Sequence, residues 1–503
     1  MKTPPSTRRS NSTDRSTGER KRATQARSSG HLPNMFARKA TDDESVVTSM
    51  AAIPANVETD KQPPMSVPFR HFVVGLAFLL GGGLVGLLAP FGALPGQAML
   101  VHLHLLLAGW VCITIMGAMT QFVPVWSGTT LHSERLSALQ LWLVTAGLFG
   151  FATSLLLGLY ELLPVFGGTM LAGFWMFVYN VGRTLLGSRP WDVTERHFAV
   201  ALGFVLVLTV FGLLLALGYT HPILAGLPFD RTDLRTAHAT LAVFGAVLTT
   251  VFGALYQLGT MFTQSDLRGI DMPLKRVEEI GYPVGVVVLA TGRLFESSTM
   301  AHIGALLVVA GLFAFGIILA RRLTGATVEW NPMLRRYAVV AASMIAWASL
   351  TVPVWIADPL SSESLFGAPS AMYLLLFGVI GFVVLGTLYH IVPFIIWVHR
   401  YSDMLGLADV PMIDDLYDDR LATVDFVALL SGFALLVIAE PLSLPRAVTA
   451  LGGTLSLVGF VVFVGNIVMV IRNHGPSSVS SILLPQVSGQ VGDSDEQPLD
   501  APE

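Results

Sequence analysis

The sequence predicts an all-α polytopic membrane protein with about twelve transmembrane helices, and three observations support this prediction. First, 53% of the 503 residues are hydrophobic and only 13% are charged, with a mean hydropathy of +0.65. Soluble domains carry about 25% charged residues, so an ordinary soluble globule is excluded. Second, apolar runs of the length that crosses a bilayer recur along the chain. Third, one of these runs is repeated twice.

The apolar runs place the membrane domain at residues 67–472. Each run is about 20 residues long, enough to cross a hydrocarbon core of roughly 30 Å. The weakest candidate is the seventh, "GYPVGVVVLATGRLF", which is short and contains Arg293. The runs are centred near residues 80, 112, 148, 172, 207, 248, 287, 310, 346, 383, 432 and 459.

The two ends of the chain differ in composition from this domain. Residues 1–66 are rich in Ser, Thr, Arg and Pro, and we expect a disordered, basic segment there. We expect residues 473–503 to form a disordered tail. Basic residues between the helices fall mostly in the even-numbered connections, for example Arg135, Arg321 and Arg400. Because cytoplasmic loops retain Lys and Arg, this pattern predicts that both termini are cytoplasmic.

A threefold repeat relates the second, sixth and tenth predicted helices, at about 99–125, 235–262 and 368–397. "HLHLLLAGWVCITIMGAMTQFVP" from His102 aligns without gaps with "HATLAVFGAVLTTVFGALYQLGT" from His238 and "AMYLLLFGVIGFVVLGTLYHIVP" from Ala371. Four helices per repeat would account for all twelve. We therefore expect three four-helix arcs with pseudo-threefold symmetry and the repeat helices around the centre. The glycines that align are Gly109, Gly245 and Gly378, then Gly117, Gly253 and Gly386.

Histidines at the outer ends of the repeat helices are the candidate ligands. His102 and His238 share one repeat position, so they should lie at the same depth, near each other or a common cavity. Ionisable groups within membranes are costly and usually functional. His104 lies ~200° around the helix from His102, so we expect only one of that pair to face the centre. Near an interface, a histidine can also simply hydrogen-bond to water or headgroups, which is our interpretation of His221 and His302.

The repeat helices resemble those of subunit I in the haem-copper oxidase superfamily. The string from His102 is similar to helix two of its cbb-type oxidase and nitric oxide reductase branch. The resemblance implies a haem ligand at His102 or His104, and a ligand to copper, or to iron as in the nitric oxide reductases, at His238. It also implies contact between Arg446 and haem propionates, although a structural salt bridge would explain this arginine equally well.

The ligand set implied by this resemblance is incomplete. Helix ten should carry two histidines where this chain has Ala371, Met372 and Tyr373, and the seventh run has no histidine pair. His390 lies roughly 28 Å further along helix ten, too far to replace them. No carboxylate chain for proton uptake is apparent within the helices. We therefore expect weak or absent oxidase activity beside possible haem or copper binding.

Three functions remain open from the sequence. The first is an oxidase-like protein of the prokaryotic cell membrane that binds haem or copper at its outer side and is related to respiratory oxygen or nitric oxide reduction. Its partners would be the lipid bilayer, an electron-donor protein and other oxidase subunits, without nucleic acid. The second is a transporter or channel for a small solute. The third is a non-catalytic haem- or copper-binding accessory protein.

Overall fold

The computed structural model describes residues 62–475 and 482–483, in which helices are joined by loops and turns and no β-strand occurs. The chain divides into two compact units, Met1–Thr48 and Ser49–Glu503. The first unit lies outside the described residues, as do most of the expected disordered N-terminal segment (1–66) and tail (473–503). All that follows concerns the second unit.

Eleven of the described helices are long and apolar enough to cross a membrane, which confirms a polytopic helical membrane protein. The seventh predicted span is not among them. It is a broken helix made of α10 (Asp271–Arg276), the π-helical segment η6 (Val277–Gly281) and α11 (Tyr282–Leu294), which packs against α12. The single-piece spans are α2 (Ser66–Leu88), α5 (Glu134–Leu157), α6 (Leu163–Leu186), α7 (Val193–Leu217), α12 (Ser298–Thr324), α13 (Pro332–Ala357), α15 (Asp419–Ala439) and α16 (Arg446–His474).

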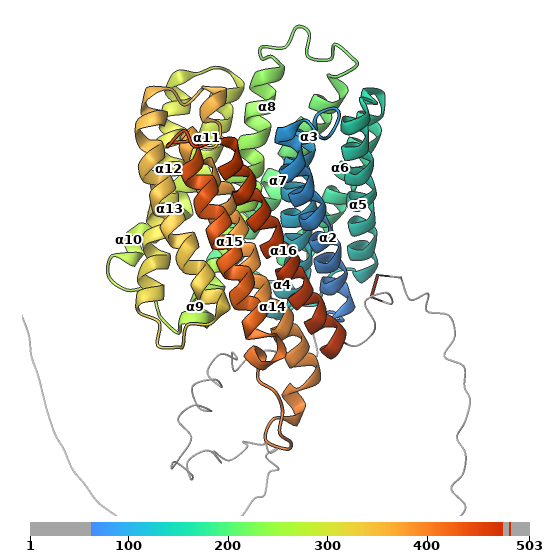
Figure 1. The fold of residues 1–503 in the computed structure, drawn as a ribbon, viewed down its shortest axis with the longest axis vertical. Helices are drawn as coiled ribbons and strands as arrows, with labels where there is room; N and C mark the ends of the chain where they lie inside the picture. Colours follow the sequence, from blue (N-terminus) through green and yellow to red (C-terminus); the bar gives the residue numbers. More distant parts are fainter. Residues whose placement is uncertain (1–61, 476–481, 484–503) are drawn as a thin grey trace, which may run out of the picture. The chain divides into compact units, whose positions relative to one another are not determined.

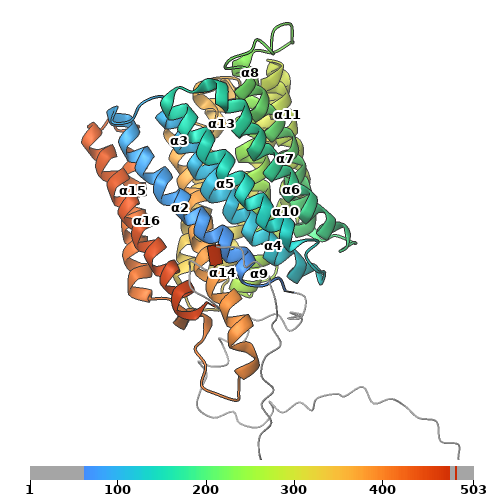
Figure 2. The same cartoon turned by 90° about the vertical axis from the view of Figure 1, so that its right-hand side faces the viewer.

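The remaining three spans are the repeat helices predicted from sequence. The first repeat helix consists of α3 (Ala98–His104), η3 (Leu105–Cys112) and α4 (Ile113–Ser127). The second consists of α8 (Arg231–Thr240), η5 (Leu241–Val247) and α9 (Leu248–Thr263), and the third of η9 (Leu374–Gly381) and α14 (Phe382–Arg400). Figure 1 and Figure 2 show α3 and α8 toward one end and α4, α9 and α14 toward the other, so the repeat helices run in the same direction.

A π-helical segment occupies the same repeat position in all three helices. Each segment begins three residues after the aligned residues His102, His238 and Ala371. π-Helical turns are rare and occur mostly at functional sites. The three π-helical segments at one repeat position therefore show that the repeats share backbone geometry. The alignment of side chains alone did not reveal this.

Polar caps fix where several helices begin on the side we predict to be cytoplasmic. The Ser133 side chain accepts a hydrogen bond from the Leu136 amide at the start of α5. Asp192 forms a capping box with Glu195 at the start of α7, and Asp418 caps α15. Such caps satisfy amide groups that a helix leaves unpaired at its first turn.

The second and third repeat helices are the most enclosed spans. Their central windows are 83% and 94% buried within the protein, against 44% for the first repeat helix and 22% for the span at Tyr160–Leu186. All three line one apolar cavity of about 80 Å³. They do so with the same repeat positions: Thr114, Ile115, Ala118, Met119 and Phe122; Thr250, Val251, Ala254, Leu255 and Leu258; Val383, Val384, Thr387, Leu388 and Ile391. None of the three is therefore confined to the periphery.

Candidate functional site

His102 and His238 are held in the same way by the helices that precede them. His102 Nδ1 lies 2.8 Å from the Gly82 carbonyl oxygen of α2, and His238 Nδ1 lies 2.8 Å from the Leu208 carbonyl oxygen of α7. Glycines make room for both rings. A Cβ at Gly86 would lie 2.3 Å from the His102 ring, and one at Gly212 would lie 3.1 Å from the His238 ring.

These hydrogen bonds determine which ring nitrogen is free. A carbonyl oxygen can only accept, so Nδ1 carries the proton in both imidazoles. In a neutral ring, Nε2 then keeps its lone pair, which is the arrangement in which histidine binds a metal ion. Both histidines are only partly buried. His102 and His238 are therefore both held in the tautomer whose Nε2 is free.

His104 and His102 have different neighbours. His104 donates from Nδ1 to the Leu100 carbonyl at 2.9 Å and packs its ring 5.1 Å from that of Phe151 in α5. His102 instead bonds to the Gly82 carbonyl of α2, and it makes no hydrogen bond or ring contact with His238. The two histidines of the first repeat helix therefore face different helices.

The third repeat carries no imidazole at this level. Ala371 replaces the histidine, and Trp347 of α13 donates from its indole nitrogen to the Phe366 carbonyl at 2.7 Å. The rings of Trp347, Trp355 and Phe244 pack at centroid distances of 5.5 to 5.8 Å. Met372 is 37% exposed. These rings form an aromatic cluster between α13 and the second repeat helix.

Arg446 is exposed at the first residue of α16 and forms no hydrogen bond or ion pair with any described residue. The buried arginine at this end is Arg293, which sequence reasoning treated only as a weakness of the seventh span. It donates to the carbonyl oxygens of Pro359 and Leu365 and to the Thr240 hydroxyl, two residues after His238. Arg293 therefore ties the end of the broken helix to the second repeat helix.

The donor set determines which cofactor the residues could hold. Among residues 62–475 and 482–483, no three His, Cys, Asp or Glu side chains gather as a metal site. A neutral imidazole with a free Nε2 can bind copper, for which imidazole is a suitable ligand. His102, His104 and His238 each bond to a carbonyl through Nδ1 and so each meet this requirement in the neutral form. Each of them could therefore give one ligand to a metal ion.

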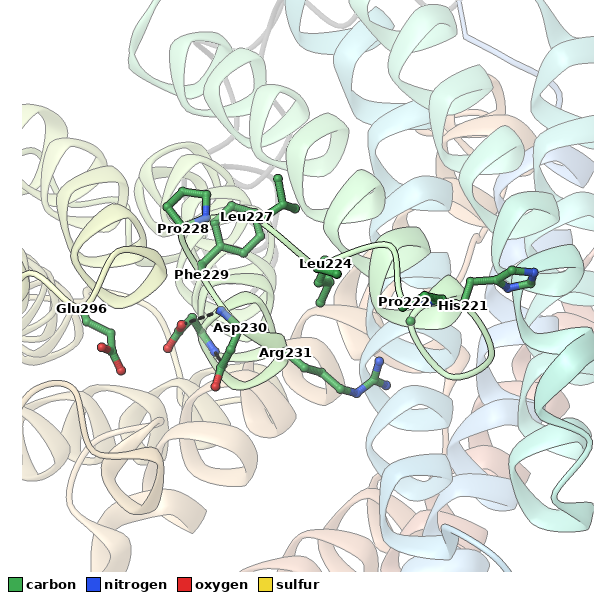
Figure 3. Close-up of a pocket in the computed structure, with 12 residues that line it drawn as sticks. His221, Pro222, Leu224, Leu227, Pro228, Phe229, Asp230, Arg231 and Glu296 are labelled. Carbon is green, nitrogen blue, oxygen red and sulfur yellow. Dashed lines mark hydrogen bonds between the residues drawn. The ribbon is translucent and has the colours of Figure 1, made fainter.

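The largest pocket lies apart from these histidines, in the connection between α7 and α8. It has a volume of about 580 Å³ and includes His221, Asp230, Arg231, Asp233 and Glu296 in its lining. Figure 3 shows Asp230 and Glu296 on one side of it and His221 on the other. Its carboxylates make it a polar pocket at the end of the helices that we predict to be outer.

Two buried carboxylates that sequence reasoning did not single out lie in the inner half of the helices. Glu278 of η6 is fully buried, accepts from the Tyr256 hydroxyl at 2.7 Å and lies 2.9 Å from His197 Nε2. Asp425 of α15, also fully buried, pairs with Arg336 and accepts from the Tyr389 hydroxyl.

A signal for these networks was present in the sequence. The triplets "RHF" at 70–72, "RHF" at 196–198 and "RRY" at 335–337 begin the helices before each repeat helix. Tyr256 and Tyr389 share one position of the aligned repeat helices, where the first copy has Thr120. The repeat therefore extends beyond the aligned helices, and it carries polar residues with it.

His390 lies in the inner half of α14, away from the predicted ligands. It is buried, its Nε2 has no hydrogen-bond partner, and its ring packs 4.1 Å from that of Phe262 and 5.8 Å from that of Phe394. This agrees with the expectation that it takes no part in an outer site.

No protein-family model matches the sequence, and no curated protein matches it. The residues described above are therefore the whole basis for assigning a function.

Proposed function

We propose that this chain is a haem-copper oxidase subunit I-like protein of the prokaryotic cell membrane that binds a transition metal, copper in the first instance, at its outer side. The repeats would form three four-helix arcs with pseudo-threefold symmetry, and both termini would be cytoplasmic. A metal-binding accessory role, or electron transfer with a donor protein or other oxidase subunits, fits this site better than complete reduction of oxygen or nitric oxide.

One observation carries the proposal. His102 and His238 occupy one repeat position and donate from Nδ1 to equivalent carbonyls, at 2.8 Å in each case. Ordinary packing does not require two rings to share an orientation that leaves Nε2 available. A hydrogen bond from the second ring nitrogen is what orients metal-binding histidines in proteins.

The missing third ligand argues against turnover. Oxygen reduction in the related enzymes needs two adjacent metal centres, and here Ala371 stands where the family has histidine. Haem, if bound, would supply a redox centre with an imidazole axial ligand. The chain's own residues hold each imidazole in one tautomer and in one orientation.

The competing proposal, a transporter or channel for a small solute, receives less support. The cavity between the three repeat helices is lined mainly by apolar side chains, apart from Thr114, Thr250 and Thr387. A pathway for a polar solute would need more polar groups there. A gas or another apolar molecule would suit the cavity better.

An absorbance spectrum and metal analysis of the purified protein test the proposal. We expect a bound metal, and we expect His102→Ala, His104→Ala and His238→Ala each to lower its content, because each variant removes a proposed ligand. His390→Ala is the matched control and should leave the content unchanged. A protein without metal or visible absorbance would overturn the proposal in favour of the transporter, and loss in the His390 variant would place the metal at the inner side.

A further inference from the structure

The inner half of the membrane domain contains three versions of one buried polar site. In the second repeat, His197, Glu278 and Tyr256 form it. In the third repeat, Arg336, Asp425 and Tyr389 form it. In both versions every carboxylate oxygen receives a hydrogen bond or an ion pair.

The first repeat has the corresponding residues His71, Gln140 and Thr120. His71 follows Arg70 as His197 follows Arg196, and its Nδ1 bonds to the carbonyl of Val67, as that of His197 bonds to Val193. Gly117 brings the first repeat helix against His71, and Gly253 brings the second against His197. In each case an added Cβ would lie 2.7 Å from the histidine Cβ.

Gln140 is identified as the counterpart of Asp425 by its surroundings. In α6, Asn180 bonds to the backbone amide and carbonyl of Ser133, the residue that caps α5. In α16, Asn466 makes the same two bonds with Asp418, the residue that caps α15. Gln140 and Asp425 lie equally far beyond these caps.

In this first version the polar groups lack partners. His71 is 1% exposed and Gln140 is fully buried. Nevertheless, His71 Nε2 and both side-chain polar atoms of Gln140 have no hydrogen-bond partner, and neither has the Ser137 hydroxyl one turn before Gln140. Leaving such atoms unpaired away from water lowers the stability of the folded state. The tyrosine that bonds to the carboxylate in the other repeats is replaced by Thr120, whose short side chain bonds back to Gly117.

We propose that the first repeat holds one or more ordered water molecules between His71 and Gln140, in place of the tyrosine hydroxyl of the other repeats. The chemistry of the unpaired atoms selects this ligand. Because His71 donates from Nδ1 to a carbonyl, its neutral ring needs a donor at Nε2. Gln140 Nε2 needs an acceptor and Gln140 Oε1 needs a donor. Water satisfies all three, and buried waters typically make about three such bonds.

This site is separate from the proposed outer metal site and does not depend on it. It also makes the first repeat different from the others, because ordered water would satisfy its polar groups in place of a carboxylate and a tyrosine.

Nitrogen-15 NMR of the histidine-labelled full chain in lipid tests the proposal through contacts between water protons and the ring nitrogens. We expect a water contact at His71 Nε2. His197 Nε2 is the internal control, because Glu278 already occupies it, and it should show none. His71→Gln and His197→Gln assign the two signals. A His71 Nε2 without a water contact, or in direct contact with the Gln140 amide, overturns the proposal.

A double-mutant cycle provides a second test that does not depend on those variants. Thr120→Tyr with Gln140→Glu rebuilds in the first repeat the arrangement of the second. We expect the double variant to melt at a higher temperature than the two single changes predict together, since the tyrosine hydroxyl then replaces the water and bonds to the carboxylate. Additive effects of the two changes would count against a shared site at these residues and overturn the proposal.

Discussion

A buried charge is tolerated in this protein where several partners surround it, as Arg336 shows. Its guanidinium is fully buried, donates to the carbonyl oxygens of Pro332 and Ala422 and pairs with Asp425. It also lies 4.6 Å from the Tyr389 ring centroid. Desolvation makes a single buried charge far more costly than a buried pair. Removing both charges of the pair should therefore cost less stability than removing one of them.

We predict that Arg336→Met destabilises the protein by about 3–5 kcal/mol, because it leaves the Asp425 carboxylate buried without its counter-charge. Thermal unfolding in detergent, followed by circular dichroism, measures this. The double variant Arg336→Met with Asp425→Leu should recover most of the loss, because it removes both charges. A double variant that is less stable than Arg336→Met would contradict the interpretation of these residues as a paired unit.

At the scale of helices, glycine decides how closely the repeat helices approach their neighbours. A Cβ at Gly253 would lie 2.7 Å from His197 Cβ and 3.2 Å from the Thr194 carbonyl oxygen, so neither a side chain nor the backbone can easily give way. Small residues at helix contacts allow such approach in membranes. Gly203, by contrast, has no atom within 4 Å of an added Cβ.

We expect Gly253→Ala to lower the stability by about 1–3 kcal/mol, because the extra methyl group overpacks the contact between α9 and α7. Gly203→Ala, on the other partner of the same helix pair, should be neutral or slightly stabilising, because alanine favours a helix more than glycine does. Melting temperatures of the two variants provide the comparison. Equal losses would indicate a general cost of replacing membrane glycines rather than a specific close approach.

The repeat helices were predictable from the sequence, whereas their π-helical segments and polar networks were not. Apolar length and aligned glycines placed the spans correctly, because both depend on local composition. The π-helical turns at Leu105, Leu241 and Leu374 have no such signature. Glu278 was missed because it lies in η6, three residues before the apolar run that predicts the seventh span begins at Gly281. Its burial depends on His197 and Tyr256, which are distant in sequence.

The outer site was predictable only in part for a related reason. His102 and His238 share a repeat position and each bonds to a carbonyl of the preceding helix, and their approach to each other or to a common cavity stays a prediction. The shared position could not show that each ring bonds to a different neighbouring helix, α2 or α7, because no pattern in a single helix reports which carbonyl lies beside it. Similarly, the choice of Arg446 rested on its place in a loop, whereas Arg293 contacts Thr240 through the folding of three separate segments.

At the scale of the whole molecule, the basic residues predict how the helices are oriented in the membrane. Both described ends of the membrane domain lie at one side, because Arg70 of α2 donates to the Ile482 carbonyl and Arg400 donates to the His474 carbonyl at the end of α16. The residues Ser362 and Leu407 lie exposed beyond opposite ends of the third repeat helix. They therefore report the direction of all three repeat helices, which run the same way.

We predict that Leu407 faces the cytoplasm and Ser362 the exterior, because basic residues are retained on the cytoplasmic side. The test is labelling of intact cells with a membrane-impermeant maleimide, in a Cys112→Ala background that removes the natural thiol. Ser362→Cys should react in intact cells, whereas Leu407→Cys, whose parent side chain is 86% exposed, should react only after permeabilisation. The reverse pattern would show that the protein has the opposite orientation in the membrane. The imidazoles of His102 and His238 would then open to the cytoplasm, and a metal bound there would exchange electrons with a cytoplasmic donor rather than an external one.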